Sequence, residues 1–76
     1  MAKEVFAGIS VDDQIVHGRP VIAGTRVPVE TIVGALAGGS SFEDVEGDYH
    51  VTVEQIRAAL GYATHLLAST TVYATN

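Results

Sequence analysis

Two arginines within residues 18–29 are the groups best suited to recognise another charged group. The segment reads GRPVIAGTRVPV and places Arg19 and Arg26 seven positions apart. A guanidinium presents its N–H donors in a fork that matches a carboxylate, so each arginine is expected to pair with an acid. For Arg26 the expected partner is Glu30, four residues further on, or an acid on a second chain. If the segment has a binding role, both arginines would contact a partner's carboxylates.

Catalytic and metal-binding chemistry has little support in the sequence. The three histidines, at positions 17, 50 and 65, do not have the spacing of a metal site. Adjacent acids such as Glu43 and Asp44 point apart on a helix and make a poor general acid–base pair. The Gly24-Thr25-Arg26 tripeptide lacks the lysine and the long glycine spacing of a phosphate-binding loop. We therefore expect a protein that is not an enzyme and holds no cofactor or metal.

Length and composition predict one domain over residues 1–76 that gains stability by self-association. A chain of 76 residues is marginally stable alone, and its lack of cysteines rules out disulfide cross-links. Its hydrophobic fraction of 47% is high for this size, which favours a homodimer. No run of residues approaches the roughly 20 apolar residues of a membrane span, and no signal peptide is recognisable. The expected location is the cytoplasm.

The charge balance favours a basic protein partner. The chain has nine acidic and four basic residues, giving a net charge of −5. Four of the acids fall within residues 43–48, and Glu43, Asp44 and Glu46 are the expected partner contacts there. Such a surface repels phosphate backbones and attracts basic groups. Tyr62 and Tyr73 are the expected aromatic anchors of an interface.

The N-terminal part, residues 1–28, is expected to form a small β portion. Residues 4–9 are a plausible strand and residues 10–15 a loop. Residues 19–22 and 25–28 are expected to form the two arms of a tight hairpin around Ala23-Gly24. Gly24 can supply the positive φ that such a turn needs, and the prolines at positions 20 and 28 belong at strand edges or ends because they cannot donate a hydrogen bond.

Residues 29–67 are expected to form three helices. The first follows the apolar spacing that begins at Val29 and ends at Gly38-Gly39. The second begins at Ser40 with Glu43 in the capping-box position and ends near Asp48. The third begins at Thr52 with Gln55 in the same position. Its expected apolar face consists of Val53, Ile56, Leu60, Ala63 and Leu67.

Two features of the third helix and its surroundings remain open in the sequence. Gly61 costs about 1 kcal/mol relative to alanine in a helix, which indicates a close approach by another element or a partner chain. Residues 68–76 lose the helical pattern and are expected to be a tail, either frayed or forming an added strand.

Residues 18–29 resemble the signature of the domain-of-unknown-function 433 family of small prokaryotic proteins. That pattern is roughly a glycine, a basic residue, Pro-Val-Ile, one residue, Gly-Thr-Arg, an aliphatic residue and Pro-Val. The match continues into the helix break at Gly39-Ser40 and the helix over residues 52–63. One departure is Tyr49-His50, where the family usually has Tyr-Pro, so the turn before the third helix is expected to be looser here.

The resemblance implies a mainly α, homeodomain-like fold: a helix-turn-helix-type bundle of three helices after a short β portion, often dimeric. It also implies an antitoxin role, because genes of this family tend to lie beside one for a PIN-like ribonuclease toxin. We therefore expect the antitoxin of a type II toxin–antitoxin pair, which neutralises such a toxin by protein–protein contact.

The alternative function is a DNA-binding transcriptional regulator, acting alone or with the toxin on its own operon. In a helix-turn-helix the third helix would present Gln55 to adenine and Arg57 to guanine. A dimer, however, would carry 2 × 4 = 8 basic and 2 × 9 = 18 acidic residues. Because phosphate neutralisation supplies most non-specific affinity, nucleic acid is expected to bind only weakly or through the toxin complex.

Overall fold

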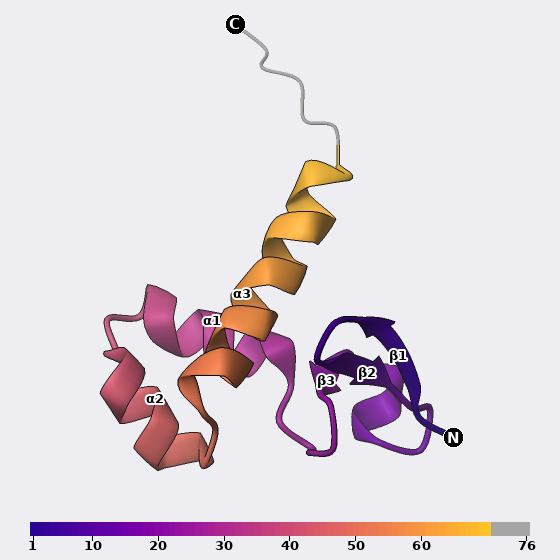
Figure 1. Cartoon of the computed structure of the whole chain (residues 1–76), viewed down its shortest axis with the longest axis horizontal. Helices are drawn as coiled ribbons and strands as arrows, with labels where there is room; N and C mark the ends of the chain where they lie inside the picture. The colour runs from indigo at the N-terminus through magenta and orange to yellow at the C-terminus, as the bar shows by residue number, and fades with distance from the viewer. Residues whose placement is uncertain (71–76) are drawn as a thin grey trace, which may run out of the picture.

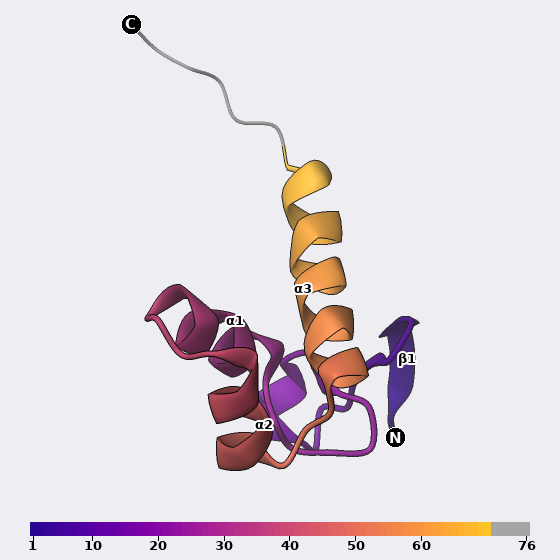
Figure 2. The same cartoon turned by 60° about the vertical axis from the view of Figure 1, so that its left-hand side comes forward.

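The computed structural model describes residues 1–70 and contains a small sheet followed by three helices. Its elements are β1 (Lys3–Phe6), β2 (Ile9–Val11), a short 3-10 turn η1 (Val16–Gly18), β3 (Val21–Ile22), α1 (Val29–Ala37), α2 (Phe42–Tyr49) and α3 (Val53–Ala68). The sheet and α2 lie at opposite ends of the molecule, and the C-terminal half of α3 projects beyond both (Figure 1). The second view shows the same projection of α3 (Figure 2).

The N-terminal sheet differs from the expected pattern of one strand and one loop. It is antiparallel with the order β1-β2-β3. The single strand predicted over residues 4–9 is wrong, because the chain reverses at Ala7-Gly8, where Gly8 has a φ of +81°. Residues 10–11, predicted as loop, belong to β2, because Ile9 and Ser10 pair with Ile22 and Val21 of β3.

The tight turn around Ala23-Gly24 forms as predicted. The Ile22 N–H donates to the Val27 carbonyl at 2.9 Å, and the Thr25 N–H donates to the Ile22 carbonyl at 3.0 Å. Gly24 has a φ of +79°, the conformation expected of it. The second arm is shorter than predicted and reduces to one bridge between Val21 and Pro28. This bridge is formed by the bonds on either side of Pro28, from the Ile22 N–H to Val27 and from the Val29 N–H to Pro20, so the missing proline N–H is not needed. The arm ends there because α1 begins at Val29.

The boundary between α1 and α2 explains one error of the sequence prediction. The Gly39 N–H donates to the Leu36 carbonyl and the Ser40 N–H to the Ala35 carbonyl, at 3.1 and 3.0 Å. With a φ of +104° at Gly39, these bonds form a Schellman motif that ends α1. Ser40 is therefore part of the end of α1, and it does not cap α2 as predicted.

The N-cap of α2 is instead Ser41, which forms a capping box with Asp44 where Glu43 had been expected. The capping box of α3 forms as predicted between Thr52 and Gln55. His50 ends α2 with a φ of +55°, which a proline cannot adopt. The turn before α3, which was expected to be looser, therefore contains a residue in a defined left-handed conformation.

The core lies where the sheet, α1 and α3 meet, with α2 closing one side. Its buried residues are Ile9, Ile22, Val29, Ile32, Val45, Val51, Ile56 and Ala59. The predicted apolar face of α3 is correct at Ile56 but wrong at Leu67, which is 73% exposed because α3 projects past the body there. Gly61 has the predicted close neighbour within the chain: an added Cβ would lie 3.5 Å from the Phe6 ring.

Helix α3 ends at Ala68, one residue beyond the predicted bundle. Residues 71–76 of the predicted tail lie outside the described residues.

We predict that Gly24→Val lowers the free energy of unfolding by about 1–3 kcal/mol, since a β-branched residue is strained at positive φ. No atom lies within 4 Å of a Cβ added at Gly24, so the loss would come from the backbone alone. Gly34→Ala is the matched control, because Gly34 lies in α1 with equally open space. This second change should raise stability by about 0.5–1 kcal/mol. Denaturant unfolding measures both, and an unchanged midpoint for Gly24→Val would contradict the assignment of the turn.

Candidate protein-interaction site

An apolar groove lies between α1 and α3. Its volume is about 390 Å³. Val29 and Val33 of α1 form one wall, and Tyr62, Ala63 and Leu66 of α3 form the other. Side chains four residues apart lie on one face of a helix, so this spacing aligns each wall along its helix. The groove can receive apolar side chains of a partner but offers no arrangement of groups for catalysis.

The remaining edge of the groove is formed by Arg19 and Pro20, which a backbone hydrogen bond holds against α1. The Val29 N–H donates to the Pro20 carbonyl at 3.0 Å, joining the first residue of α1 to the segment before β3. Arg19 then reaches Glu30, and the two side chains form an ion pair at the rim of the groove. The prediction that Glu30 pairs with Arg26 is therefore wrong, because Arg19 lies beside the first turn of α1 and occupies that carboxylate.

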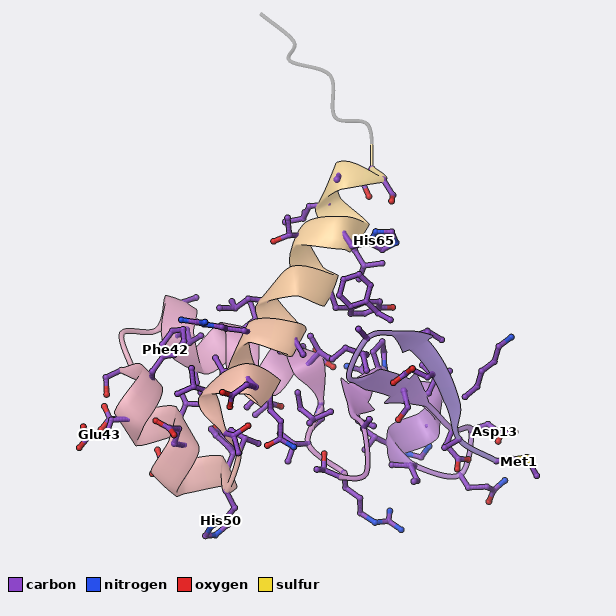
Figure 3. The ribbon with its side chains drawn as sticks, viewed as in Figure 1. Met1, Asp13, Phe42, Glu43, His50 and His65 are labelled. Atoms are coloured by element: carbon purple, nitrogen blue, oxygen red, sulfur yellow. The ribbon has the colours of Figure 1, made fainter. Side chains whose placement is uncertain are left out.

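Two leucines near the end of α3 are exposed, and only the first of them lines the groove. Leu66 is 47% exposed although it lines the groove, and Leu67 next to it is 73% exposed. Tyr62 is half-buried and packs against Phe6 with ring centroids 5.7 Å apart. The ring centroid of His65, on the same helix, lies 5.3 Å from that of Phe6. Figure 3 labels His65 on the projecting part of α3.

The structure brings together only some of the predicted partner-binding residues. Arg19 and Tyr62 both line the groove. The α2 acids do not: Glu43 lies at the far end of the molecule from Met1 (Figure 3), and the Asp44 carboxylate caps α2. Glu46 is half-buried on the same helix, and Arg26 lines a separate hollow. Tyr73 lies outside the described residues.

Of the two residues predicted to contact DNA, Gln55 is engaged within the chain and Arg57 is exposed. The Gln55 carboxamide oxygen accepts from the Thr52 N–H at 2.8 Å, so its role in the capping box occupies the acceptor that would read adenine. Arg57 is exposed on α3. The structure thus leaves Arg57 as the better placed of the two predicted base contacts.

The Asp12 carboxylate near the N-terminus is held by hydrogen bonds within the chain. The Gln14 N–H donates to the Asp12 carboxylate at 2.9 Å and lowers the pKa of that carboxyl, with a smaller contribution from the Met1 amino group. Within residues 1–70 there is no group of three or more side chains that could hold a metal ion. No helix of that same part is long and apolar enough to cross a membrane.

Comparison with known proteins identifies the family. The model described as "Protein of unknown function (DUF433)" matches residues 9–63, which include both walls of the groove except Leu66. The chain belongs to the DUF433 family. The resemblance seen in residues 18–29 is thereby confirmed.

Two relatives of this DUF433 chain come from Mycobacterium tuberculosis. The first, named "Putative antitoxin VapB45", is 39% identical over 54 residues, which are 71% of this chain and 23% of the relative. The second, named "Uncharacterized protein Rv2308", is 32% identical over 59 residues, which are 78% of this chain and 25% of that protein. The chain thus spans about a quarter of the length of either relative.

A solved structure has the same fold over most of the DUF433 region. The crystal structure of Rv2018 from Mycobacterium tuberculosis superposes with a TM-score of 0.64 at 39% identity. The match covers 71% of this chain and 25% of that one.

Sequence reasoning missed most of the groove. Leu66 was not expected at a binding surface, and Val33 was expected only as part of the apolar spacing of the first helix, although each lies four residues after another wall residue, Tyr62 and Val29 respectively. That spacing was visible in the sequence, but a second apolar stripe on a helix becomes a groove only when two helices are placed side by side. The closing contribution of Pro20 depends on a hydrogen bond to a residue nine positions away and left no local signal.

We predict that Arg19 and Glu30 are weakly coupled in stability. Their side chains are 60% and 62% exposed, and exposed ion pairs contribute about 0.2–1 kcal/mol. A double-mutant cycle with Arg19→Gln and Glu30→Gln, measured by denaturant unfolding, should give a coupling energy in that range. The coupling should shrink further in 1 M salt (about 3 Å of screening length). A larger, salt-insensitive coupling would show that the pair stabilises the fold and does more than line the rim.

Proposed function

We propose that the chain acts as the antitoxin of a type II toxin–antitoxin pair and neutralises a PIN-like ribonuclease toxin by direct contact. The observation that carries this proposal is the 39% identity to the M. tuberculosis relative named "Putative antitoxin VapB45". The groove supports it, since its walls are suited to packing and carry no catalytic constellation. The proposed role is accordingly a non-enzymatic one.

The apolar groove between α1 and α3, with Leu66 at its exposed end, is the proposed toxin-binding surface. Apolar side chains that are exposed in the free chain, such as Leu66, gain most when a partner removes them from water. The Arg19–Glu30 pair at the rim supplies polar groups around that centre, the usual arrangement of a protein interface. The acids of α2 add a negative potential that attracts a basic RNA-binding protein over a longer range.

We further infer a homeodomain-like arrangement of α1, α2 and α3 and a homodimeric state. The compact packing of α1 on α3, with α2 joined to α3 by a short capped turn, supports the first inference. Exposed Val5, Phe42 and Leu67 in so small a chain support the second, because a second copy would cover apolar surface that one domain cannot.

We predict that the chain co-purifies with the product of the neighbouring toxin gene and relieves its toxicity. Leu66→Asp should weaken binding about tenfold or more, because it places a charge in the proposed apolar centre. Leu67→Asp is the matched control: it is the adjacent exposed leucine but does not line the groove. Calorimetry of the purified pairs measures both variants.

The outcomes separate the function from the surface. If the unmodified chain neither binds the toxin nor relieves toxicity, the antitoxin function is wrong. If it binds but Leu66→Asp and Leu67→Asp bind equally well, the function stands and the groove is not the interface.

The second candidate function, DNA binding, is favoured by one observation, the exposed position of Arg57 on the helix that follows the α2–α3 turn. The net charge of −5 opposes it.

We predict that the chain alone does not retard its own promoter DNA in a gel shift, even at low salt where phosphate contacts are strongest. Retardation that disappears in Arg57→Gln would establish the regulator function instead.

A further inference from the structure

A second hollow lies beside the Gly24 turn, away from the apolar groove. Its volume is about 500 Å³, and it is lined by Ala2, Ser10, Ile15, Gly24, Thr25 and Arg26. It therefore joins the N-terminus, the central strand β2 and the signature segment.

Ser10 is a buried polar residue whose hydroxyl has no partner within residues 1–70. The residue is only 7% exposed, yet its side chain makes no hydrogen bond in that part of the chain. In the same residues, no fully buried side-chain nitrogen or oxygen lacks a hydrogen-bond partner. The Ser10 hydroxyl must therefore be reachable from outside, and the hollow that it lines is the route.

Arg26 is a cation without an acid in the part of the chain that the structure describes. The ion pairs there join Met1 to Asp12 and Arg19 to Glu30. The carboxylates of α2 cannot reach it: Ala2 lines the hollow, and Figure 3 places its neighbour Met1 at the opposite end of the molecule from Glu43. A guanidinium that forms no ion pair within residues 1–70, in a chain of net charge −5, is available for an external anion.

The turn at Gly24-Thr25 fixes the backbone at Arg26 and leaves space beside it. The Thr25 hydroxyl donates to the Ile22 carbonyl at 2.7 Å and accepts from the Val27 N–H at 3.0 Å, which fixes the backbone on both sides of Arg26. At Gly24 an added Cβ would meet no atom within 4 Å, so the missing side chain leaves open space at the wall of the hollow.

We propose that this hollow receives the carboxylate of an aspartate or glutamate side chain carried by a protein partner. The Arg26 guanidinium can donate two parallel hydrogen bonds to a carboxylate, and the Ser10 hydroxyl can donate one more. Ala2 and Ile15 supply apolar walls for the methylene groups of the acidic side chain. A phosphate group would carry nearly two charges to a site with a single arginine and is matched less well.

The net charge of the chain favours a partner-borne acid over a free one. An excess of five negative charges weakens, without abolishing, the binding of small anions from solution. An acid on an already docked protein arrives at a high effective concentration and does not meet this barrier. The identity of the carrier rests on the proposed toxin partner, but the carboxylate site itself does not, and it is tested without the toxin.

The test is an NMR titration of the full chain with three blocked tripeptides, alanyl-X-alanine amides in which X is glutamate, glutamine or phosphoserine, and with sodium acetate at matched ionic strength. We expect the glutamate peptide to shift the Ser10, Gly24 and Arg26 amide signals in a saturable way. The glutamine peptide and acetate should bind at least about tenfold more weakly, the loss that follows from removing a charged hydrogen-bonded pair or its neighbouring contacts.

Variants localise the binding to this hollow. Arg26→Gln should weaken the glutamate peptide about tenfold, and Ser10→Ala by a smaller factor. Arg26→Lys keeps the charge but loses the fork and should fall between Arg26→Gln and the unmodified chain. Arg57→Gln is the matched control, because it removes the same charge from an exposed arginine that does not line the hollow. Thermal unfolding of each variant checks that the fold is retained.

Several results would overturn the proposal. Equal affinity for the glutamate and glutamine peptides would exclude a carboxylate site, and preference for the phosphoserine peptide would change the ligand class. Acetate binding as tightly as the glutamate peptide would point to a free small carboxylate. If Arg26→Gln and Arg57→Gln weaken binding equally, the effect is general charge and not the hollow. Toxin binding lost through Leu66→Asp alone would leave the carboxylate result unaffected.

Discussion

The two hydrogen bonds of the Thr25 hydroxyl hold the segment on which both candidate surfaces depend. By bridging the Ile22 carbonyl and the Val27 N–H, this side chain closes the turn that returns the chain from β3 toward α1. The return places Val29 beside Pro20, where their backbone hydrogen bond forms. Arg19 then lies at the groove, and Arg26, on the other side of the turn, lies at the second hollow.

This arrangement also explains why the two arginines of one motif have different environments. Arg19 lies just before β3 and meets the first turn of α1, so its charge is matched by Glu30 within the chain. Arg26 follows the turn and lines the second hollow, and within residues 1–70 it forms no ion pair. One short segment therefore contributes one satisfied cation and one available cation.

Local sequence rules predicted the features that depend on neighbouring residues. The Thr52–Gln55 capping box, the end of α1 at Gly38-Gly39 and the positive φ of Gly24 all follow from side-chain and backbone chemistry within a few positions. The same rules misplaced the α2 cap, because Ser40 and Ser41 are equally good capping residues and only the Schellman motif decides between them. They also missed the strand break at Gly8, where a glycine could equally have continued a strand.

What the sequence could not predict is the pairing of elements. The ion pair of Arg19 with Glu30 spans eleven positions, and the groove needs α1 and α3 side by side. Neither relation has a local pattern: the ion pair follows from the hydrogen bond between Val29 and Pro20. The groove follows from burial of Ile32, Ile56 and Ala59 in a common core. The residues of the family signature are thus explained chiefly by the turn that they build. Their value for recognition is indirect, because that turn presents an apolar groove on one side and, on the other, an arginine that has no ion pair within residues 1–70.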